Sequence, residues 1–179
     1  MADDEERLVL LAQAGDQHAF DTLLRSYERP LFHHIHRMLG NEEACYEALQ
    51  ETYLAIVRNI GKLRDRTSFR PWAYGVATRV CLKARTKWAR RHEEYEEQVE
   101  APDGRPPPDV LAAVREQKEE IMDRVDLLSP RLRSVILLHF YEGLTLREVA
   151  AALEISLGTV KSRLAAGLER LRTEYQGVA

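Results

Sequence analysis

The sequence has few cysteines and no long hydrophobic run. Its two cysteines, Cys45 and Cys81, each stand alone within a helical pattern, which argues against a disulfide framework or a CxxC metal site. No apolar stretch approaches the ~20 residues that a membrane-spanning helix needs. The acidic start, MADDEER, lacks the basic and apolar regions of a signal peptide. We therefore expect a cytoplasmic protein with reduced thiols.

The sequence also lacks strand patterns and the residue groups typical of enzymes. No nucleophile–base arrangement and no phosphate-binding glycine loop is present. The histidines of FHHIHR (His33, His34 and His36) suggest a metal site, but no carboxylate or cysteine ligand lies at paired spacing. A polar or partly packed helix face is the better interpretation. We expect an all-α protein that is not an enzyme and needs no cofactor.

The formal net charge of −3 conceals strongly charged segments. Residues 1–61 and 92–129 carry net charges of −6 and −8, whereas residues 62–91 carry +9 and residues 130–179 carry +2. Such blocks indicate separate surfaces with separate partners. The basic block is suited to a polyanion, which the two acidic blocks would repel.

Helical periodicity predicts three helices in the first half of the chain. Hydrophobic residues at helical spacing run from 16 to 39, with a kink expected at Pro30. Asn41 is a favourable N-cap for a second helix, which should extend to about residue 60. Ser68 is suited to cap a third helix reaching about residue 91, and a proline is tolerated in its first turn.

A proline-rich acidic segment follows the third helix. Residues 92–109, HEEYEEQVEAPDGRPPPD, contain seven acidic residues and four prolines. This composition cannot bury hydrophobic area and predicts a flexible, extended linker. Hydrophobic residues from Val114 to Leu128 indicate a further helix beyond it. We predict two small helical domains, residues 1–91 and 110–179, joined by this linker.

Residues 144–164, LTLREVAAALEISLGTVKSRL, carry the signals of two short helices joined by a tight turn. Thr145 and Glu148 fit a capping box at the start of the first helix. Ser156 is a favourable cap for the second. Alanines in the first helix allow close packing at a steep angle. The segment therefore predicts a helix-turn-helix, a common DNA-reading motif.

The second helix of this motif has one hydrophobic and one polar face. Spacings of four, four and three residues predict a buried stripe of Val160, Leu164, Leu168 and Leu171. The side chains that face away from this stripe or flank it are mostly polar or basic: Lys161, Ser162, Arg163, Ala166, Glu169 and Arg172. This face is suited to DNA.

The segment SFRPWAYGVATRVCLKARTKWARR combines basic and aromatic residues. Its positive charge favours nucleic acid. Trp72 shares a helix face with hydrophobic residues such as Phe69 and Val76, so we expect it in the core. Tyr74 falls off that face, so we expect it to be exposed and able to stack on a base.

Three further stretches complete a family pattern. EALQETYL matches a motif ending in Gln-Glu-Thr, SFRPWAY matches SFRxWxY, and the segment from LSPRLRSVILL to GTVKSRLAAGLERLR matches the end of a C-terminal domain. The chain thus resembles the extracytoplasmic-function (ECF) sigma factors of the sigma-70 family over nearly its whole length. The GTVKSRL block in this context is highly specific.

The resemblance implies a role in transcription initiation. Residues 1–91 would correspond to sigma region 2, which binds core RNA polymerase and the −10 element, and residues 110–179 to region 4, which binds the −35 element. The implied polymerase contacts are the clamp, through Glu47, Gln50 and Glu51, and the flap. Residues implied in −10 binding and melting are Lys62, Arg64, Arg66, Arg70, Tyr74, Arg79 and Lys83. Those implied in −35 binding are Arg147, Thr159, Lys161, Ser162 and Arg163. An anti-sigma factor is a further implied partner.

The sequence departs from the family pattern at several of these positions. An acidic residue usual in the family is replaced by Tyr46, and the usual Asp by Glu47. An Asn common in the −10 helix is replaced by Arg79. Bulky or basic residues of the −35 helix are replaced by Ala165 and Ala166. These changes leave two alternatives open besides a sigma factor: a sigma mimic that binds anti-sigma proteins without reading promoters, and an autonomous helix-turn-helix regulator.

Overall fold

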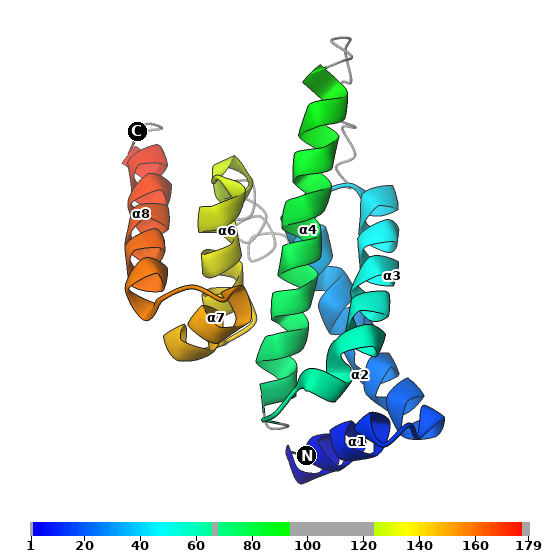
Figure 1. The fold of residues 1–179 in the computed structure, drawn as a ribbon. Helices are drawn as coiled ribbons and strands as arrows, with labels where there is room; N and C mark the ends of the chain where they lie inside the picture. Colours follow the sequence, from blue (N-terminus) through cyan, green and yellow to red (C-terminus); the bar gives the residue numbers. More distant parts are fainter. Residues whose placement is uncertain (1, 66–67, 94–123, 177–179) are drawn as a thin grey trace, which may run out of the picture.

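The computed structural model describes residues 2–65, 68–93 and 124–176, and every regular element within them is a helix (Figure 1). The predicted all-α fold is therefore confirmed. Residues 94–109 of the predicted linker, Arg66, and most of the helix expected from Val114 lie outside the described residues. The elements are α1 Ala2–Gln13, α2 Gln17–Leu39, α3 Glu42–Asn59, the 3-10 helix η1 Ile60–Lys62, α4 Phe69–Glu93, α6 Pro130–Ile136, the π-helix η3 Leu137–Tyr141, α7 Leu146–Leu153 and α8 Leu157–Gln176.

The N-terminal unit consists of α1 to α4. Local capping sets its helix boundaries: the side chain of Asp16 accepts a hydrogen bond from the Ala19 amide at the start of α2. As predicted, Asn41 caps α3 and accepts a hydrogen bond from the Ala44 amide. Gly40, at a φ of 74°, ends α2. α2 continues through Pro30, so the proline does not break the helix.

The sequence did not reveal α1, which closes one end of this unit. Val9 is fully buried within the common core. The Tyr27 hydroxyl donates to the Glu5 carboxylate at 2.6 Å. The Gln13 amide donates to the carbonyls of Ile60 and Leu63 at 2.9 and 2.7 Å. These bonds hold α1 against the loop that leads into α4.

The C-terminal unit contains the predicted helix-turn-helix, formed by α7 and α8. Both halves of the capping box are present between Thr145 and Glu148, and the Ser156 hydroxyl accepts from the Thr159 amide at 3.0 Å. Glu154 lies in the left-handed region at a φ of 56° and makes the turn between the helices.

The predicted stripe of α8 is wrong at one position. Val160 is fully buried, but Leu168 is 43% exposed. Gly167 faces the core instead: a Cβ at this glycine would lie 3.2 Å from a side-chain carbon of Ile136. Because a glycine leaves room for α6, the buried face of α8 turns toward Gly167 and away from Leu168.

The two units pack together along α4. In Figure 1, α4 (green) stands between α2 and α3 on one side and α6 and α7 on the other. α7 contacts α4 directly, whereas α8 packs on α6 and α7. The helix carrying most of the predicted −10 residues is therefore the helix against which the second unit rests.

Candidate nucleic-acid interface

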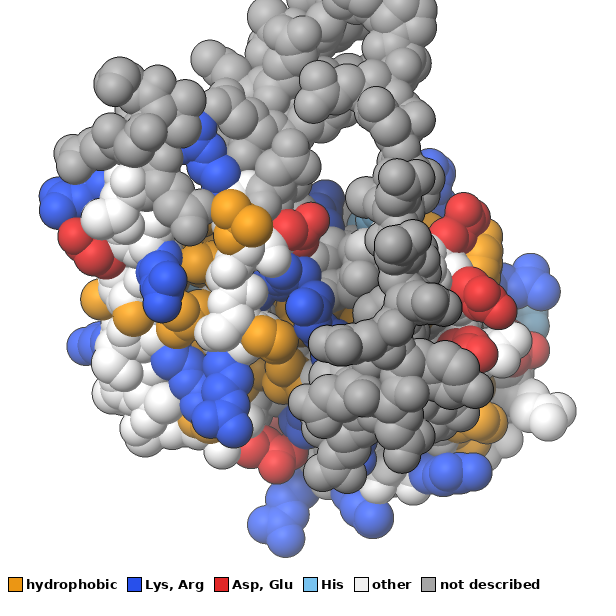
Figure 2. Space-filling model, turned by 90° about the horizontal axis from the view of Figure 1, so that it is seen from above, with side chains coloured by type: hydrophobic (Ala, Val, Ile, Leu, Met, Phe, Trp, Pro, Cys, Tyr) orange, Lys and Arg blue, Asp and Glu red, His pale blue; other side chains and the backbone are white. Residues whose placement is uncertain are grey.

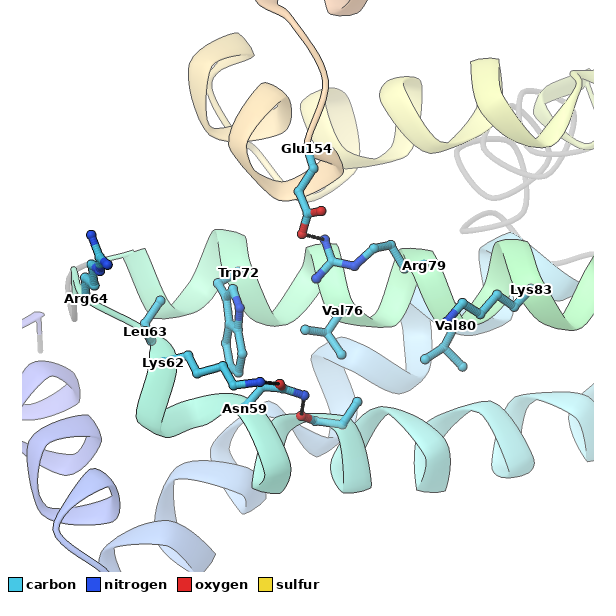
Figure 3. A pocket seen from close by; sticks show the side chains of 11 residues that line it. Asn59, Lys62, Leu63, Arg64, Trp72, Val76, Arg79, Val80, Lys83 and Glu154 are labelled. Atoms are coloured by element: carbon cyan, nitrogen blue, oxygen red, sulfur yellow. Dashed lines mark hydrogen bonds and ion pairs between the residues drawn. The ribbon is translucent and has the colours of Figure 1, made fainter.

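A basic cavity lies between α3, η1 and α4. Its volume is about 560 Å³. Trp72 forms one wall, and Val76 and Val80 of α4 contribute hydrophobic surface (Figure 3). Basic and amide side chains also line the cavity: Asn59, Lys62, Arg64, Arg79 and Lys83. The Glu154 carboxylate lines it from the turn after α7. An aromatic wall with basic residues around it can hold a base together with its phosphate.

Trp72 combines features of a core residue with those of a surface on which a base could stack. It packs on the core, with its ring 5.8 Å from that of Phe69, yet it stays partly exposed where it meets the cavity. Close by, the Lys62 ammonium donates to the Asn59 side chain at 3.0 Å, and Asn59 donates to the Ala55 carbonyl at 2.8 Å. These bonds orient the polar edge of the cavity.

The predicted exposure of Tyr74 is wrong, because this side chain is only 3% exposed. Its ring meets His34 edge to face at 5.3 Å, and the Arg70 guanidinium lies over it at 5.8 Å. Burial and the nearby Glu142 carboxylate raise the pKa of Tyr74 well above its ordinary value. Periodicity had identified one buried face of α4, but packing of the second unit buries another.

The remaining predicted −10 residues divide into two groups. Lys62, Arg64 and Lys83 are exposed on or beside the cavity. Arg70 and Arg79 are already bound to the second unit: Arg70 donates to the Glu142 carbonyl, and Arg79 donates to the Ala152 carbonyl at 2.7 Å. Among the described residues, no hydrogen bond or ion pair joins the first group to the second unit.

The predicted −35 residues belong to the two helices of the helix-turn-helix, α7 and α8. Lys161 and Ser162 are exposed on α8, and Arg147 is exposed on α7. Thr159 and Arg163 are partly buried. Viewed from above, Lys and Arg side chains gather with hydrophobic ones on the side of the molecule occupied by α6 and α8 (Figure 2). A helix with such an exposed basic face can enter a DNA groove.

The predicted polymerase contacts share one exposed face of α3. Glu47, Gln50 and Glu51 are all exposed. The same helix exposes Leu54 and Val57, at 52% and 51%, which the sequence patterns did not single out. Acidic and hydrophobic side chains side by side are typical of a protein-binding surface.

Glu142 is a second residue that sequence reasoning missed. Its side chain is 8% exposed and lies 3.3 Å from Nδ1 of His34 and 3.4 Å from the Arg37 guanidinium. Burial alone would raise the pKa of Glu142, but hydrogen bonds from His34 and Tyr74 and the charges of His34 and Arg37 outweigh it, so the pKa is lowered. His34 also bonds Thr78 through Nε2 at 2.8 Å. This histidine therefore has a packing role.

The described part of the chain shows neither a metal-ligand cluster nor a membrane-spanning helix. No group of three or more histidine, cysteine or acidic residues is arranged to hold a metal ion there. None of the described helices is both long and apolar enough to cross a membrane.

Comparison with known proteins identifies both units. The Sigma-70 region 2 family matches residues 23–92, and the Sigma-70, region 4 family matches residues 125–173. The chain is 31% identical over 170 residues to the RNA polymerase sigma-E factor of Streptomyces avermitilis, covering 90% of the chain and 88% of the relative. It is 29% identical over 173 residues to the ECF RNA polymerase sigma factor SigW of Bacillus subtilis, covering 90% and 91%.

Solved structures share this fold. CnrH, in complex with the cytosolic domain of CnrY, superposes with a TM-score of 0.71 at 18% identity, covering 98% of this chain and 99% of that one. The sigma factor RpoE of Bartonella quintana, in complex with the anti-sigma factor NepR, gives a TM-score of 0.66 at 16% identity, covering 88% and 96%.

Proposed function

Since the chain belongs to the ECF sigma factors of the sigma-70 family, we propose that its two helical units divide promoter recognition between them. The protein is a sigma factor that binds core RNA polymerase and promoter DNA and directs transcription initiation at a specific set of promoters. Sigma factors are initiation factors and not enzymes, so the polymerase supplies the catalysis. We place the protein in the cytoplasm, with the polymerase.

The N-terminal unit, residues 1–91, would hold the −10 element. The cavity beside Trp72 offers an aromatic wall, and Lys62, Arg64 and Lys83 offer charge for a single-stranded phosphate backbone. Arg66, Arg70, Arg79 and the buried Tyr74 were also implied by the family resemblance. Of the described residues among these, Arg70 and Arg79 fit direct strand contact better than the enclosed Tyr74.

The C-terminal unit, residues 110–179, would read the −35 element. Lys161 and Ser162 project from the exposed face of α8, near its N-terminal end. The positive end of the helix dipole there also favours a phosphate. Ala165 and Ala166 place only short side chains on the next turn of α8, so few side chains there can reach base edges. Sequence reading would then depend on Lys161 and Arg163.

The polymerase contact would use the exposed face of α3. Glu47, Gln50 and Glu51 provide charge that can orient docking on the clamp, and Leu54 and Val57 provide hydrophobic area to bury. An anti-sigma factor is the remaining proposed partner, because RpoE was solved with the anti-sigma factor NepR and CnrH with the cytosolic domain of CnrY.

The observation that carries this proposal is the pairing of a basic, Trp-walled cavity with a separate exposed helix-turn-helix in one chain. Neither the cavity nor the helix-turn-helix alone would account for contacts to both the −10 and the −35 elements. Core polymerase supplemented with this protein should initiate RNA synthesis at discrete start sites on genomic DNA, with common sequences upstream. A mimic would bind an anti-sigma protein but give no transcripts, and an autonomous regulator would bind its duplex specifically without polymerase.

A further inference from the structure

We propose that Gln13 is a positioning residue for −10 recognition, because its side-chain amide fixes the turn that carries part of the basic cavity wall. Gln13 is the last residue of α1. It would act through the turn between α3 and α4, without touching DNA itself. This inference rests on the proposed −10 role of the cavity beside Trp72.

The Gln13 amide donates two hydrogen bonds to this turn. Its Nε2 lies 2.9 Å from the carbonyl oxygen of Ile60 and 2.7 Å from that of Leu63. A glutamine amide nitrogen carries two hydrogens, so one group can hold both carbonyls at once. Ile60 begins the 3-10 helix η1, and Leu63 is the residue that follows it. The two bonds therefore span η1 and fix both of its ends against α1 (Figure 1).

η1 is too short to hold its position through its own hydrogen bonds. It consists of three residues, and the Leu63 amide closes it by donating to the Ile60 carbonyl at 3.1 Å. The geometry of 3-10 hydrogen bonds is poorer than that of α-helical ones. Gln13 adds two contacts from a residue 47 and 50 positions away in the chain. The path of the turn is therefore set by α1 as well as by its own residues.

The turn supplies two of the cations proposed to hold the −10 strand. Lys62, Leu63 and Arg64 follow one another along it and line the cavity (Figure 3). The side chains of Lys62 and Arg64 are exposed, so their positions follow from the backbone that carries them. A binding site needs its groups held to within about 0.5 Å by neighbours that support them. A displaced turn would move both cations relative to Trp72.

α1 is itself fixed firmly enough to serve as the support. Val9 is fully buried, and the Tyr27 hydroxyl donates to the Glu5 carboxylate at 2.6 Å. The ring of Tyr27 meets Phe69 edge to face at 5.2 Å, and Phe69 lies 5.8 Å from Trp72. Through these contacts α1 is joined to the aromatic wall of the cavity, and through Gln13 it is joined to the basic wall.

Gln13→Glu tests the proposal, because a carboxylate of the same shape cannot donate and would face two carbonyl oxygens. Gln17→Glu is the matched control: Gln17 is exposed at the start of α2, and the change in net charge is the same. Holoenzyme with each variant is assayed on a promoter mapped by the transcription experiment above. Single-base variants of its −10 and −35 elements are assayed alongside.

Gln13→Glu should lower initiation about tenfold, the loss expected when two hydrogen bonds are removed. It should also lower the ratio of initiation on the native −10 element to that on its variants, because reading bases requires a fixed turn. The corresponding −35 ratios should not change, and Gln17→Glu should match the wild type throughout. Gln13→Ala brings no repulsive charge, so it should show the same pattern with a smaller loss, and it decides the question if Gln13→Glu does not fold.

Tyr27→Phe separates positioning from the stability of α1. It removes the hydroxyl that donates to Glu5 and leaves the Gln13 bonds in place, so it should lower the thermal midpoint but keep the −10 ratios of the wild type. Unchanged −10 ratios in the folded Gln13 variants would overturn the proposal, as would an equal fall in Gln17→Glu or Tyr27→Phe. A wild-type holoenzyme that ignores −10 substitutions would instead remove the proposed function on which the inference rests.

Discussion

The carboxylate of Glu142 lies 3.3 Å from the imidazole of His34, a residue 108 positions earlier in the chain. Both side chains are buried, and each has further partners, Arg37 for Glu142 and Thr78 for His34. The contact joins the N-terminal and C-terminal units at a point that water hardly reaches. It makes the association of the units sensitive to the charge of one carboxylate.

Acidification should weaken this association. The pKa of Glu142 is lowered from its ordinary value of 4.5. The protein with its two units associated therefore binds fewer protons than a protein whose units have separated and whose Glu142 carboxylate is solvated. The stabilisation from Glu142 is therefore fully present above pH 4.5 and is lost as the pH falls from there through the lowered pKa. Small-angle X-ray scattering of the free protein from pH 7 to pH 3.5 should show expansion in the acidic part of this range.

The groups that face Glu142 are His34, Arg37, Arg70 and Tyr74. His34→Gln, measured in the same series, separates the histidine from the carboxylate. Glu142→Gln should already be expanded at pH 7 and change little below it. If the wild type and Glu142→Gln follow the same curve, Glu142 does not control the association.

Promoter reading should depend on two basic residues of α8, the exposed Lys161 and the partly buried Arg163. Replacing Lys161 or Arg163 with alanine should cost on the order of 1–3 kcal/mol of promoter binding by holoenzyme. A base-reading residue should also relax the preference at one −35 position, whereas a phosphate contact should weaken all sequences equally. The measurement is promoter binding on a panel of single-base −35 variants.

Arg170→Ala is the matched control, because Arg170 is an exposed arginine farther along the same helix. It should leave promoter binding within a few tenths of a kcal/mol of wild type. Unchanged initiation in both the Lys161 and Arg163 variants would mean that α8 is not a reader, and the mimic alternative would then gain support.

Polymerase binding should depend on the charge of α3. Glu47→Lys combined with Glu51→Lys should weaken competition for core polymerase by about tenfold, since complementary charge steers and registers such contacts. Helical content should not change, because both side chains are exposed. The same charge change on α2, Asp21→Lys with Glu28→Lys, controls for net charge. Equal loss in both double variants would contradict a specific contact on α3.

The two cysteines should react slowly in the native protein. Burial is the main cause that raises the pKa of Cys45 to about 11 and of Cys81 to about 12, so fewer than about one thiol in a thousand is ionised at pH 8. Ellman's reagent should titrate both thiols only after denaturation. Because both pKa values are raised, the stability that depends on neutral thiols is complete below pH 9 and is lost as the pH rises toward 11. Rapid native labelling would show that the α3–α4 contact opens readily.

Local interactions explain why much of the fold could be predicted. Asn41, the pair Thr145 and Glu148, and Ser156 each cap a helix through atoms within three residues, so their roles are legible without knowing the rest of the molecule. The helix-turn-helix, the exposed Lys161 and Ser162, and the exposed acidic face of α3 follow from such signals.

Positions whose surroundings come from distant segments could not be predicted. Tyr74 was expected to be exposed because α4 had only one recognisable hydrophobic face, and the C-terminal unit covers the other. Leu168 was expected to be buried because leucine spacing was regular, but Gly167 offers α6 a closer approach. α1 was missed because its stability comes from contacts with Tyr27 and the η1 loop more than from its own pattern.

By itself, the sequence determined the helical class, the helix-turn-helix, the basic character of α4 and the family, because hydrophobic periodicity, capping and charge are properties of neighbouring residues. Only the tertiary structure decided that Glu142 and Glu154 meet the cations of the N-terminal unit and that Gly75 lies against Ala152. Those contacts join residues more than 70 positions apart, and nothing in the spacing of either partner specifies the other. Burial makes the contacts of Glu142 and Gly75 matter, because a paired charge or a missing Cβ is decisive only where water and free space are excluded.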